Sequence, residues 1–170
     1  MEGRYAIVDV ETTGFSPRED RVVEVACVVL DGALREVAAF SSLVDPGRAI
    51  PHYATAVHGI RDRDVAGAPA LASLRGRLRA LTAGTTVVAH NASFDRRFLD
   101  CLDDREWLCT LKLARRAFPE APAFGNQFLR RYLGIDDPRL RALTAHRAYA
   151  DAIVTAGVLR ACLTRLRLAS

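Results

Sequence analysis

The sequence has 170 residues, half of them apolar and 26% charged, a composition typical of a folded domain and not of a disordered chain. Lys and Arg number 24 against 20 Asp and Glu, so the net charge of +4 only weakly favours a polyanionic partner. No segment approaches the roughly 20 apolar residues that span a bilayer, and no signal-peptide pattern is found. The four cysteines form no CxxC pair and have no metal-finger spacing, so we expect reduced thiols. We therefore expect one domain over residues 1–170, in the cytoplasm and away from membranes.

The first part of the chain predicts strands that are joined by short connections. Apolar and β-branched runs predict three strands, at residues 5–10, 21–30 and 34–44. Residues 45–68 contain several prolines and glycines, so we expect them to be mostly loop. Leucines at helical spacing then predict a helix over residues 69–81.

The second part alternates strands with helices. Strands are expected at residues 85–89 and near Trp107 and Leu108. Helices are expected at residues 91–102 with Asn91 as N-cap, 110–118, 127–133 and 147–165. A meander followed by this alternation predicts an α/β fold of three layers with a mixed sheet.

The first strand ends in Asp9-Val10-Glu11-Thr12-Thr13-Gly14. Residues two apart on a strand share a face, so Asp9 and Glu11 emerge together. Two clustered carboxylates repel each other, and a divalent cation would stabilise both ionised forms. Gly14 would let the backbone approach a ligand closely. An acidic surface turn explains the same residues, and this motif alone leaves both interpretations open.

A second group is His90-Asn91-Ala92-Ser93-Phe94-Asp95, where a strand passes into a helix. Asp95, just beyond the first helical turn, can project toward the same sheet edge. Phe94 could stack on a nucleobase. The alternatives are a core position for Phe94 and an ion pair from Asp95 to Arg96 or Arg97.

The third group is His146-Arg147-Ala148-Tyr149-Ala150-Asp151, at the start of the last helix. Residues five apart on a regular helix do not share a face, so His146 and Asp151 can reach one site only if His146 precedes the regular helix. Histidine is a natural general base at neutral pH. The alternatives are a helix-start hydrogen bond for His146 and an i,i+4 ion pair between Asp151 and Arg147.

Together the three groups supply four carboxylates and a histidine at element ends. Two divalent cations would balance the charge of the carboxylates, as in sites that clamp a phosphodiester between two metals. Oxygen ligands favour Mg²⁺ or Mn²⁺ over zinc. The predicted metal ligands are Asp9, Glu11, Asp95 and Asp151.

The three motifs resemble those of the DEDDh exonucleases of the DnaQ group, in the RNase H-like superfamily, which includes the proofreading epsilon subunit of bacterial DNA polymerase III. Ala56-Val57-His58-Gly59-Ile60 and Cys109-Thr110-Leu111-Lys112-Leu113-Ala114-Arg115 resemble two further family segments. The resemblance implies a mixed five-stranded sheet flanked by helices and two Mg²⁺ or Mn²⁺ ions, with His146 as the base that deprotonates the attacking water. It also implies release of nucleoside 5′-monophosphates from the 3′ ends of single-stranded DNA, in proofreading or repair. The residues expected around the terminal nucleotide are Thr12, Thr13, Gly14, His58, Asn91 and Phe94.

Three departures from the family pattern stand out. Tyr53 replaces a glutamate that often contacts the terminal hydroxyl, and Tyr149 replaces a commoner leucine. We find no tail or clamp-binding motif, so a polymerase partner is possible but a stand-alone nuclease or a domain of a longer protein fits better. The alternatives are an exoribonuclease that trims RNA or short oligonucleotides, a nuclease that cuts internally, and a catalytically dead nucleic-acid-binding module.

Overall fold

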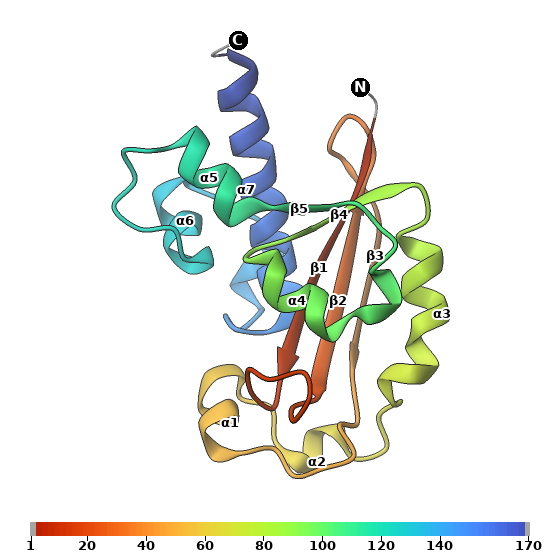
Figure 1. The fold of residues 1–170 in the computed structure, drawn as a ribbon. Coiled ribbons are helices and arrows are strands. Elements are labelled where there is room, and N and C mark those ends of the chain that lie inside the picture. Colours follow the sequence, from red (N-terminus) through yellow and green to blue (C-terminus); the bar gives the residue numbers. More distant parts are fainter. Residues whose placement is uncertain (1–2, 169–170) are drawn as a thin grey trace.

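The computed structural model describes residues 3–168 (Figure 1). The five strands are β1 (Arg4–Thr12), β2 (Val22–Leu30), β3 (Glu36–Leu43), β4 (Thr85–Ala89) and β5 (Trp107–Cys109). The α-helices are α1 (His52–His58), α2 (Asp62–Val65), α3 (Leu71–Leu81), α4 (Ala92–Phe98), α5 (Thr110–Ala117), α6 (Asn126–Tyr132) and α7 (Ala148–Leu168). Two 3₁₀ turns, η1 (Asp100–Leu102) and η2 (Pro138–Arg141), complete the described elements.

The strands form one mixed sheet in the order β3-β2-β1-β4-β5. β1 pairs antiparallel with β2 and β2 with β3, as the predicted meander requires, whereas β4 runs parallel to β1 and β5 parallel to β4. The carboxyl ends of β1, β4 and β5 therefore meet at one edge. This mixed five-stranded sheet flanked by helices confirms the predicted α/β architecture.

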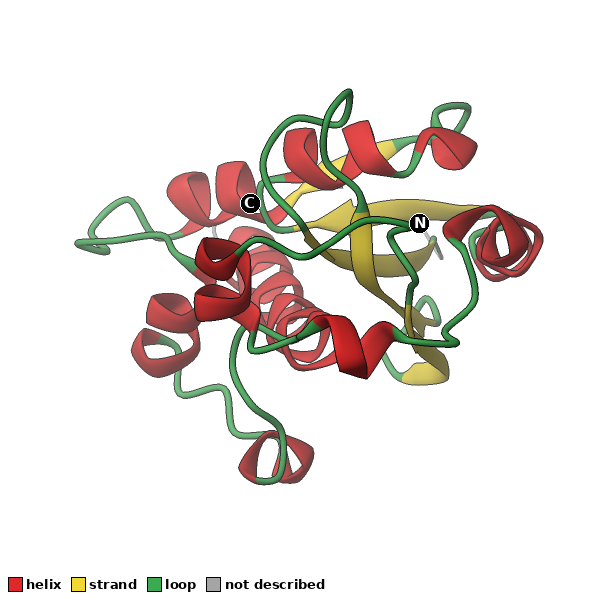
Figure 2. Cartoon of the chain, turned by 90° about the horizontal axis from the view of Figure 1, so that it is seen from below, coloured by secondary structure: helices red, strands yellow, loops and turns green. Residues whose placement is uncertain are grey.

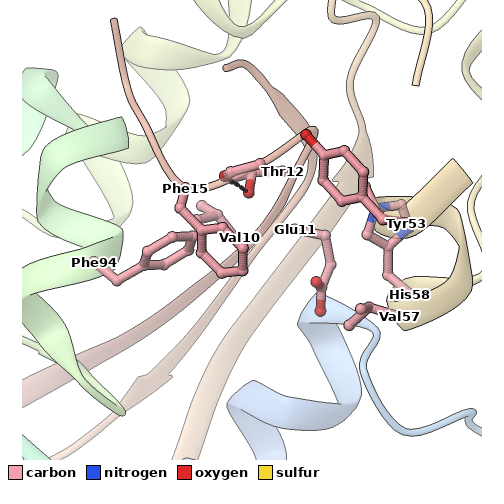
Figure 3. Close-up of a pocket in the computed structure, with 10 residues that line it drawn as sticks. Val10, Glu11, Thr12, Phe15, Tyr53, Val57, His58 and Phe94 are labelled. Carbon is pink, nitrogen blue, oxygen red and sulfur yellow. Dashed lines mark hydrogen bonds between the residues drawn. The ribbon is translucent and has the colours of Figure 1, made fainter. Parts of the chain in front are cut away.

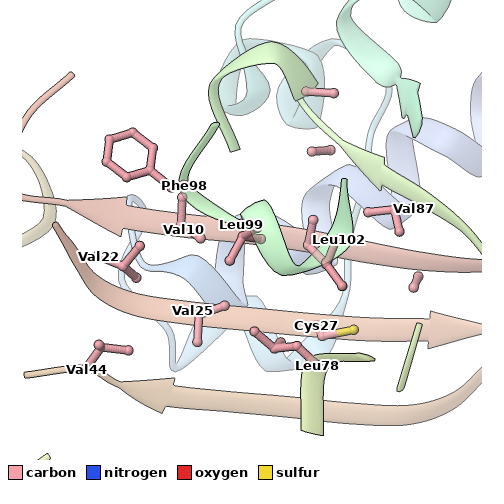
Figure 4. Close-up of a cluster of buried hydrophobic side chains, with 14 of the residues drawn as sticks. Val10, Val22, Val25, Cys27, Val44, Leu78, Val87, Phe98, Leu99 and Leu102 are labelled. Carbon is pink, nitrogen blue, oxygen red and sulfur yellow. The ribbon is translucent and has the colours of Figure 1, made fainter. Parts of the chain in front are cut away.

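Helices cover both faces of the sheet (Figure 2). On one face, Val8, Val25 and Cys27 pack with residues of α3, α4 and η1 such as Leu78 (Figure 4). On the other face, alternate strand residues such as Ile7 and Val28 pack against the alanines of α7. A second side of α7 packs on α5 and α6, which explains why this helix is buried around most of its circumference. Because side chains alternate along β1, Asp9 and Glu11 point to the face that α7 covers.

The segment 45–68 was expected to be mostly loop, and more than half of it is irregular, but it also contains the short helices α1 and α2, which were not predicted. Pro51 and Gly59 do not interrupt helical structure there, because they flank α1 at its N-cap and C-cap. Gly59 adopts φ 75°, and its N–H donates to the carbonyl of Thr55 at 2.8 Å. The proline and glycine content thus marked the ends of short helices. In Figure 1, α1 and α2 lie beside the carboxyl end of β1.

The helix expected at residues 91–102 is shorter than predicted. α4 ends at Phe98, and η1 follows it after Leu99 leaves helical geometry. Asn91 does occupy the position before the helix, but its side chain caps no backbone N–H. It adopts a left-handed conformation with φ 67° and ψ 50°, which suits a tight turn from β4 and which asparagine tolerates. Within residues 3–168, no helix combines the length and apolar character needed to cross a bilayer.

Candidate active site

Three carboxylates converge at the edge of the sheet where β1 ends. Asp9 and Glu11 come from β1, and Asp151 comes from the first turn of α7, which packs on that face. Each offers a carboxylate oxygen within 4.8 Å of the other two. Asp151 is 8% exposed. A strand and a helix distant in sequence thus bring together three of the predicted metal ligands.

Asp95 reaches the same place from the opposite face of the sheet. It lies on α4, is 3% exposed, and accepts a hydrogen bond at Oδ1 from the backbone N–H of Val10 at 3.2 Å. It does not pair with its neighbours: Arg96 pairs with Asp103, and Arg97 donates to the carbonyl of Ser93. Asp95 lies outside the tight group of three oxygens, but its charge contributes to raising the pKa of Asp9.

The carboxylates are electrostatically frustrated in the absence of a cation. Burial, followed by repulsion from Asp95 and Glu11, raises the pKa of Asp9 well above its ordinary value. Burial, with repulsion from Asp151 next, raises the pKa of Glu11 to about 9. Burial also raises the pKa of Asp95 to about 7 and raises that of Asp151. Among residues 3–168, no lysine or arginine forms an ion pair with these four side chains. Arg147 lies near enough to lower the pKa of Glu11, but burial and repulsion prevail. A buried, oxygen-only cluster of this kind fits Mg²⁺ or Mn²⁺.

His146 lies on the loop before α7, where it was expected if it shares a site with Asp151. Its backbone has φ 58°, and its side chain is 55% exposed. Its Nδ1 lies 3.9 Å from Oδ2 of Asp151, which places the imidazole at the rim of the carboxylate cluster. The alternative ion pair between Asp151 and Arg147 does not form, because Arg147 instead pairs with Glu24 at 2.6 Å.

Next to the carboxylates lies a largely apolar cavity of about 200 Å³ (Figure 3). Phe15 and Tyr53 rim the cavity and are 77% and 60% exposed. The ring of Phe94 lies 5.1 Å from that of Phe98 in the core and 6.3 Å from that of Phe15 at the rim, so Phe94 packs on the core, and its stacking on a nucleobase stays a prediction. The lining residues are Val10, Glu11, Thr12, Gly14, Phe15, Tyr53, Ala54, Val57, His58 and Phe94.

Of the residues expected around a terminal nucleotide, Thr12, Gly14, His58 and Phe94 line this cavity. Thr13 does not line it, because its fully buried hydroxyl donates to Asp20 and accepts from the N–H of Arg21. Asn91 lines a different pocket, on the side of α4 toward α5.

Gly14 also has a structural role beside the cavity, and the expected close approach of a ligand to its backbone stays a prediction. A Cβ at this position would lie 2.5 Å from Oδ2 of Asp20, so glycine is needed for the approach of Asp20. The carboxylate of Asp20 in turn fixes the loop through Thr13 and the backbone N–H of Ser16. The absent side chain thus serves the folding of the loop that borders the cavity.

Two further histidines, His58 and His90, lie beside the site. His58 is 3% exposed, and its Nδ1 accepts from the N–H of Ile60 at 3.0 Å. Its buried Nε2 has no hydrogen-bond partner among the described residues. Burial lowers the pKa of His58, and the nearby backbone of Thr12 acts in the opposite direction. His90 contacts Thr110 Oγ1 and the carbonyl of Phe124, so it links the end of β4 to the loop after α5.

Two polar residues that no sequence motif predicted also contact this site. Gln127 donates from Nε2 to Oδ1 of Asp151 at 2.5 Å, and Glu24 holds the start of α7. Gln127 lies on α6, and no local motif marks it. Glu24 lies opposite Glu11 in the pairing of β2 with β1, which places both on one face, but the sequence pattern does not specify this register.

Comparison with known proteins supports a nuclease assignment. The sequence profile of the family described as "Exonuclease" (RNase T) matches residues 6–159. Exodeoxyribonuclease 10 of Escherichia coli is 38% identical over 156 residues, covering 90% of this chain and 66% of that protein. The DNA polymerase III subunit epsilon-like protein of Rhodobacter capsulatus is 36% identical over 161 residues, covering 89% of this chain and 22% of that protein. This chain thus spans less than two thirds of the length of either relative.

Solved structures agree with this assignment. Exonuclease X in complex with 5′ overhanging duplex DNA superposes with a TM-score of 0.80 at 34% identity, over 94% of this chain and 91% of that one. Exonuclease I superposes with a TM-score of 0.83 at 19% identity, over 98% of this chain and 42% of that one. These matches confirm the predicted RNase H-like fold. The chain therefore belongs to the RNase T-type exonuclease family, the DEDDh phosphodiester hydrolases.

Proposed function

We propose that this chain is a metal-dependent 3′–5′ exonuclease that removes nucleoside 5′-monophosphates from single-stranded DNA ends. The observation that carries the proposal is the cluster of Asp9, Glu11 and Asp151, whose oxygens lie within 4.8 Å of one another and, within residues 3–168, form no ion pair with an arginine or lysine. Such a cluster is unfavourable for folding unless divalent cations bind it. It therefore has the properties of a site for cations.

Asp9, Glu11, Asp95 and Asp151 would hold two Mg²⁺ or Mn²⁺ ions. When bound, the cations would neutralise the carboxylates and stabilise charge that develops on the phosphodiester. Asp95 is held through the N–H of Val10, and Asp151 through Gln127, so the protein fixes two of the four side chains from outside the cluster.

His146 is the candidate general base. It stands beside Asp151 on an exposed loop, where its ring can face a water molecule that attacks a bound phosphodiester. Removal of the proton from water increases its nucleophilicity, and a positioned base contributes about 10²–10⁴-fold to rate. The carboxylate of Asp151 would stabilise the imidazolium that forms.

The apolar cavity is suited to the terminal nucleoside. Glu11 is part of its lining, and in Figure 3 the Glu11 carboxylate points toward the start of α7 while Phe94 and Phe15 lie on the other side. A base between aromatic faces would place its phosphate near the carboxylates. The preference for DNA rests on the similarity to exodeoxyribonuclease 10 and to the structure of exonuclease X with DNA.

A degradation assay tests the proposal directly. Matched DNA and RNA single strands labelled at the 5′ end are incubated with Mg²⁺, with Mn²⁺ and with EDTA, and products are resolved by length. We expect metal-dependent stepwise shortening from the 3′ end, release of 5′-mononucleotides, faster turnover of DNA, and no shortening by Asp9→Ala.

Each rival predicts a different result in the same assay. Faster turnover of RNA would assign an exoribonuclease, and cutting of a circular single strand would assign an endonuclease. Binding of the strands without release of mononucleotides under either metal would overturn the enzyme assignment in favour of a binding module.

A further inference from the structure

Glu24 is a fifth carboxylate beside the four candidate metal ligands, but its environment is different. β2 pairs it with Glu11, so it faces α7 from the same side of the sheet. It is 5% exposed, and Arg147 donates to it from two nitrogens, at 2.6 Å to Oε1 and 3.0 Å to Oε2. Its Oε2 also accepts from the backbone N–H of Ala148 at 2.8 Å. The charge of Glu24 is therefore balanced by Arg147, and its carboxylate oxygens accept hydrogen bonds from the residues at the start of α7.

These contacts hold the two residues that directly follow His146. The side chain of Arg147 and the N–H of Ala148 both bind Glu24, and the carbonyl of Arg147 accepts from the N–H of Asp151 at 3.0 Å. His146 itself is exposed, and its ring lies 3.9 Å from Asp151, beyond hydrogen-bond distance. Its position is thus set mainly by its backbone, which has an uncommon positive φ of 58°.

We infer that Glu24 and Arg147 are positioning residues, which fix the loop conformation that presents His146 to the reacting phosphodiester. The inference rests on the proposed function, because it assigns a role relative to the catalytic histidine. Arg147 is suited to the task, since its planar guanidinium binds a carboxylate through two parallel hydrogen bonds. The competing explanation is that the pair only fastens α7 to β2 and contributes to stability.

Arg139 provides a matched control within the same protein. It also binds a glutamate of the sheet through two nitrogens, with both distances to Glu36 at 2.9 Å, and it contacts α7 through the hydroxyl of Tyr149. It lines none of the cavities at the site. A loss of stability without a loss of turnover is therefore expected from Arg139→Gln.

The test compares kcat and KM on single-stranded DNA for Arg147→Gln, Glu24→Gln and Arg139→Gln. We expect Arg147→Gln to lower kcat about 10–100-fold with KM within about 3-fold, because a misplaced general base loses rate and not substrate affinity. Arg147→Lys keeps the charge without the paired geometry and should recover part of the loss. Arg139→Gln should keep the wild-type kcat.

A double-mutant cycle with His146→Ala separates positioning from stability. If Arg147 acts through His146, Arg147→Gln should change kcat less than about 3-fold in the His146→Ala background. An equal loss in both backgrounds, or an unchanged kcat in Arg147→Gln, would overturn the inference. Melting temperatures identify any variant that fails to fold, and Arg147→Lys then serves as the test variant.

A second readout does not depend on catalysis. In protein labelled with ¹³C at histidine Cε1, the His146 signal is assigned from its loss in His146→Ala, and its order parameter is measured in each variant. We expect a lower order parameter in Arg147→Gln and Glu24→Gln but not in Arg139→Gln, and no difference would overturn the inference. An inactive wild-type protein would instead refute the proposed function, so the two failures are distinguishable.

Discussion

Two regions beside the start of α7 use carboxylates in opposite ways. In the first, Asp9, Glu11 and Asp151 crowd together with no arginine or lysine partner among the described residues, and burial raises the pKa of each. In the second, near η2, Arg139 binds both Glu36 and Asp137, and the pKa of Asp137 is lowered by that hydrogen bonding. The difference indicates that the η2 region contributes to stability, whereas the first region reduces stability, as expected of the proposed cation site.

Asp9→Asn should have the largest effect. Removal of this central carboxylate should lower kcat by roughly 10³-fold, a magnitude typical for loss of one preorganised electrostatic group. In EDTA, however, the variant should be more stable than wild type by about 1–3 kcal/mol, because a source of repulsion is removed. Urea denaturation and the degradation assay measure the two effects. A variant that is both active and less stable would contradict the distinction between the regions.

Divalent cations should stabilise the protein in a pH-dependent manner. The pKa of Glu11 is raised from 4.5 to about 9, so the folded metal-free protein keeps a proton that the unfolded chain releases between these values. The folded state binds more protons, and stability without metal therefore falls as pH rises through this range. Saturating Mg²⁺ should reverse the fall, with about 2.7 kcal/mol gained at 100 times Kd.

The measurement is thermal unfolding from pH 5.5 to 9 with EDTA or with Mg²⁺. The difference between the two curves should widen toward high pH in wild type and should be much reduced in Asp9→Asn. A constant difference would show that protons and cations do not compete for the cluster.

Sequence reasoning predicted those features of the site that depend on local periodicity. Alternation along β1 placed Asp9 and Glu11 on one face. Residues five apart on a helix do not share a face, so His146 was expected to lie before α7 if it shares a site with Asp151. The pair Glu24–Arg147 spans 123 residues and depends on the register of β2 against β1, which local patterns do not specify. The missed α1 has a similar origin, because Pro51 and Gly59 can either break a helix or flank one.

Arg139→Gln should have a smaller effect and one confined to stability. The variant leaves Glu36 and Asp137 without their shared partner, but both carboxylates keep access to water, and the Arg139 side chain is 40% exposed. We expect a loss of about 1 kcal/mol in urea denaturation and an unchanged kcat. A tenfold fall in kcat would show that the η2 region also supports catalysis.

Asp137→Asn should have the smallest effect, a loss of a few tenths of a kcal/mol. The amide oxygen of asparagine can still accept from the backbone N–H of Arg139, which Asp137 binds at 3.0 Å. The charge and the hydrogen bond from Arg139 Nη2 to Oδ2 are lost, but both lie at a partly exposed site. Because the folded-state pKa of Asp137 lies below its ordinary 3.8, the contribution of its charge is present above that value and is lost as pH falls through the folded pKa.

Asp9→Asn and Asp137→Asn are the same chemical change, and they should respond to pH with opposite sign. Relative to wild type, Asp9→Asn should gain stability as pH rises, because the ionised carboxylate is what the folded metal-free protein disfavours. Asp137→Asn should show a constant deficit from pH 8 to pH 5 that disappears only in stronger acid. Parallel pH series in EDTA would reveal whether these slopes differ. If the two slopes coincide, the crowded carboxylates around Asp9 respond to pH like the ion-paired surface carboxylate of Asp137, and the crowding does not indicate a cation site.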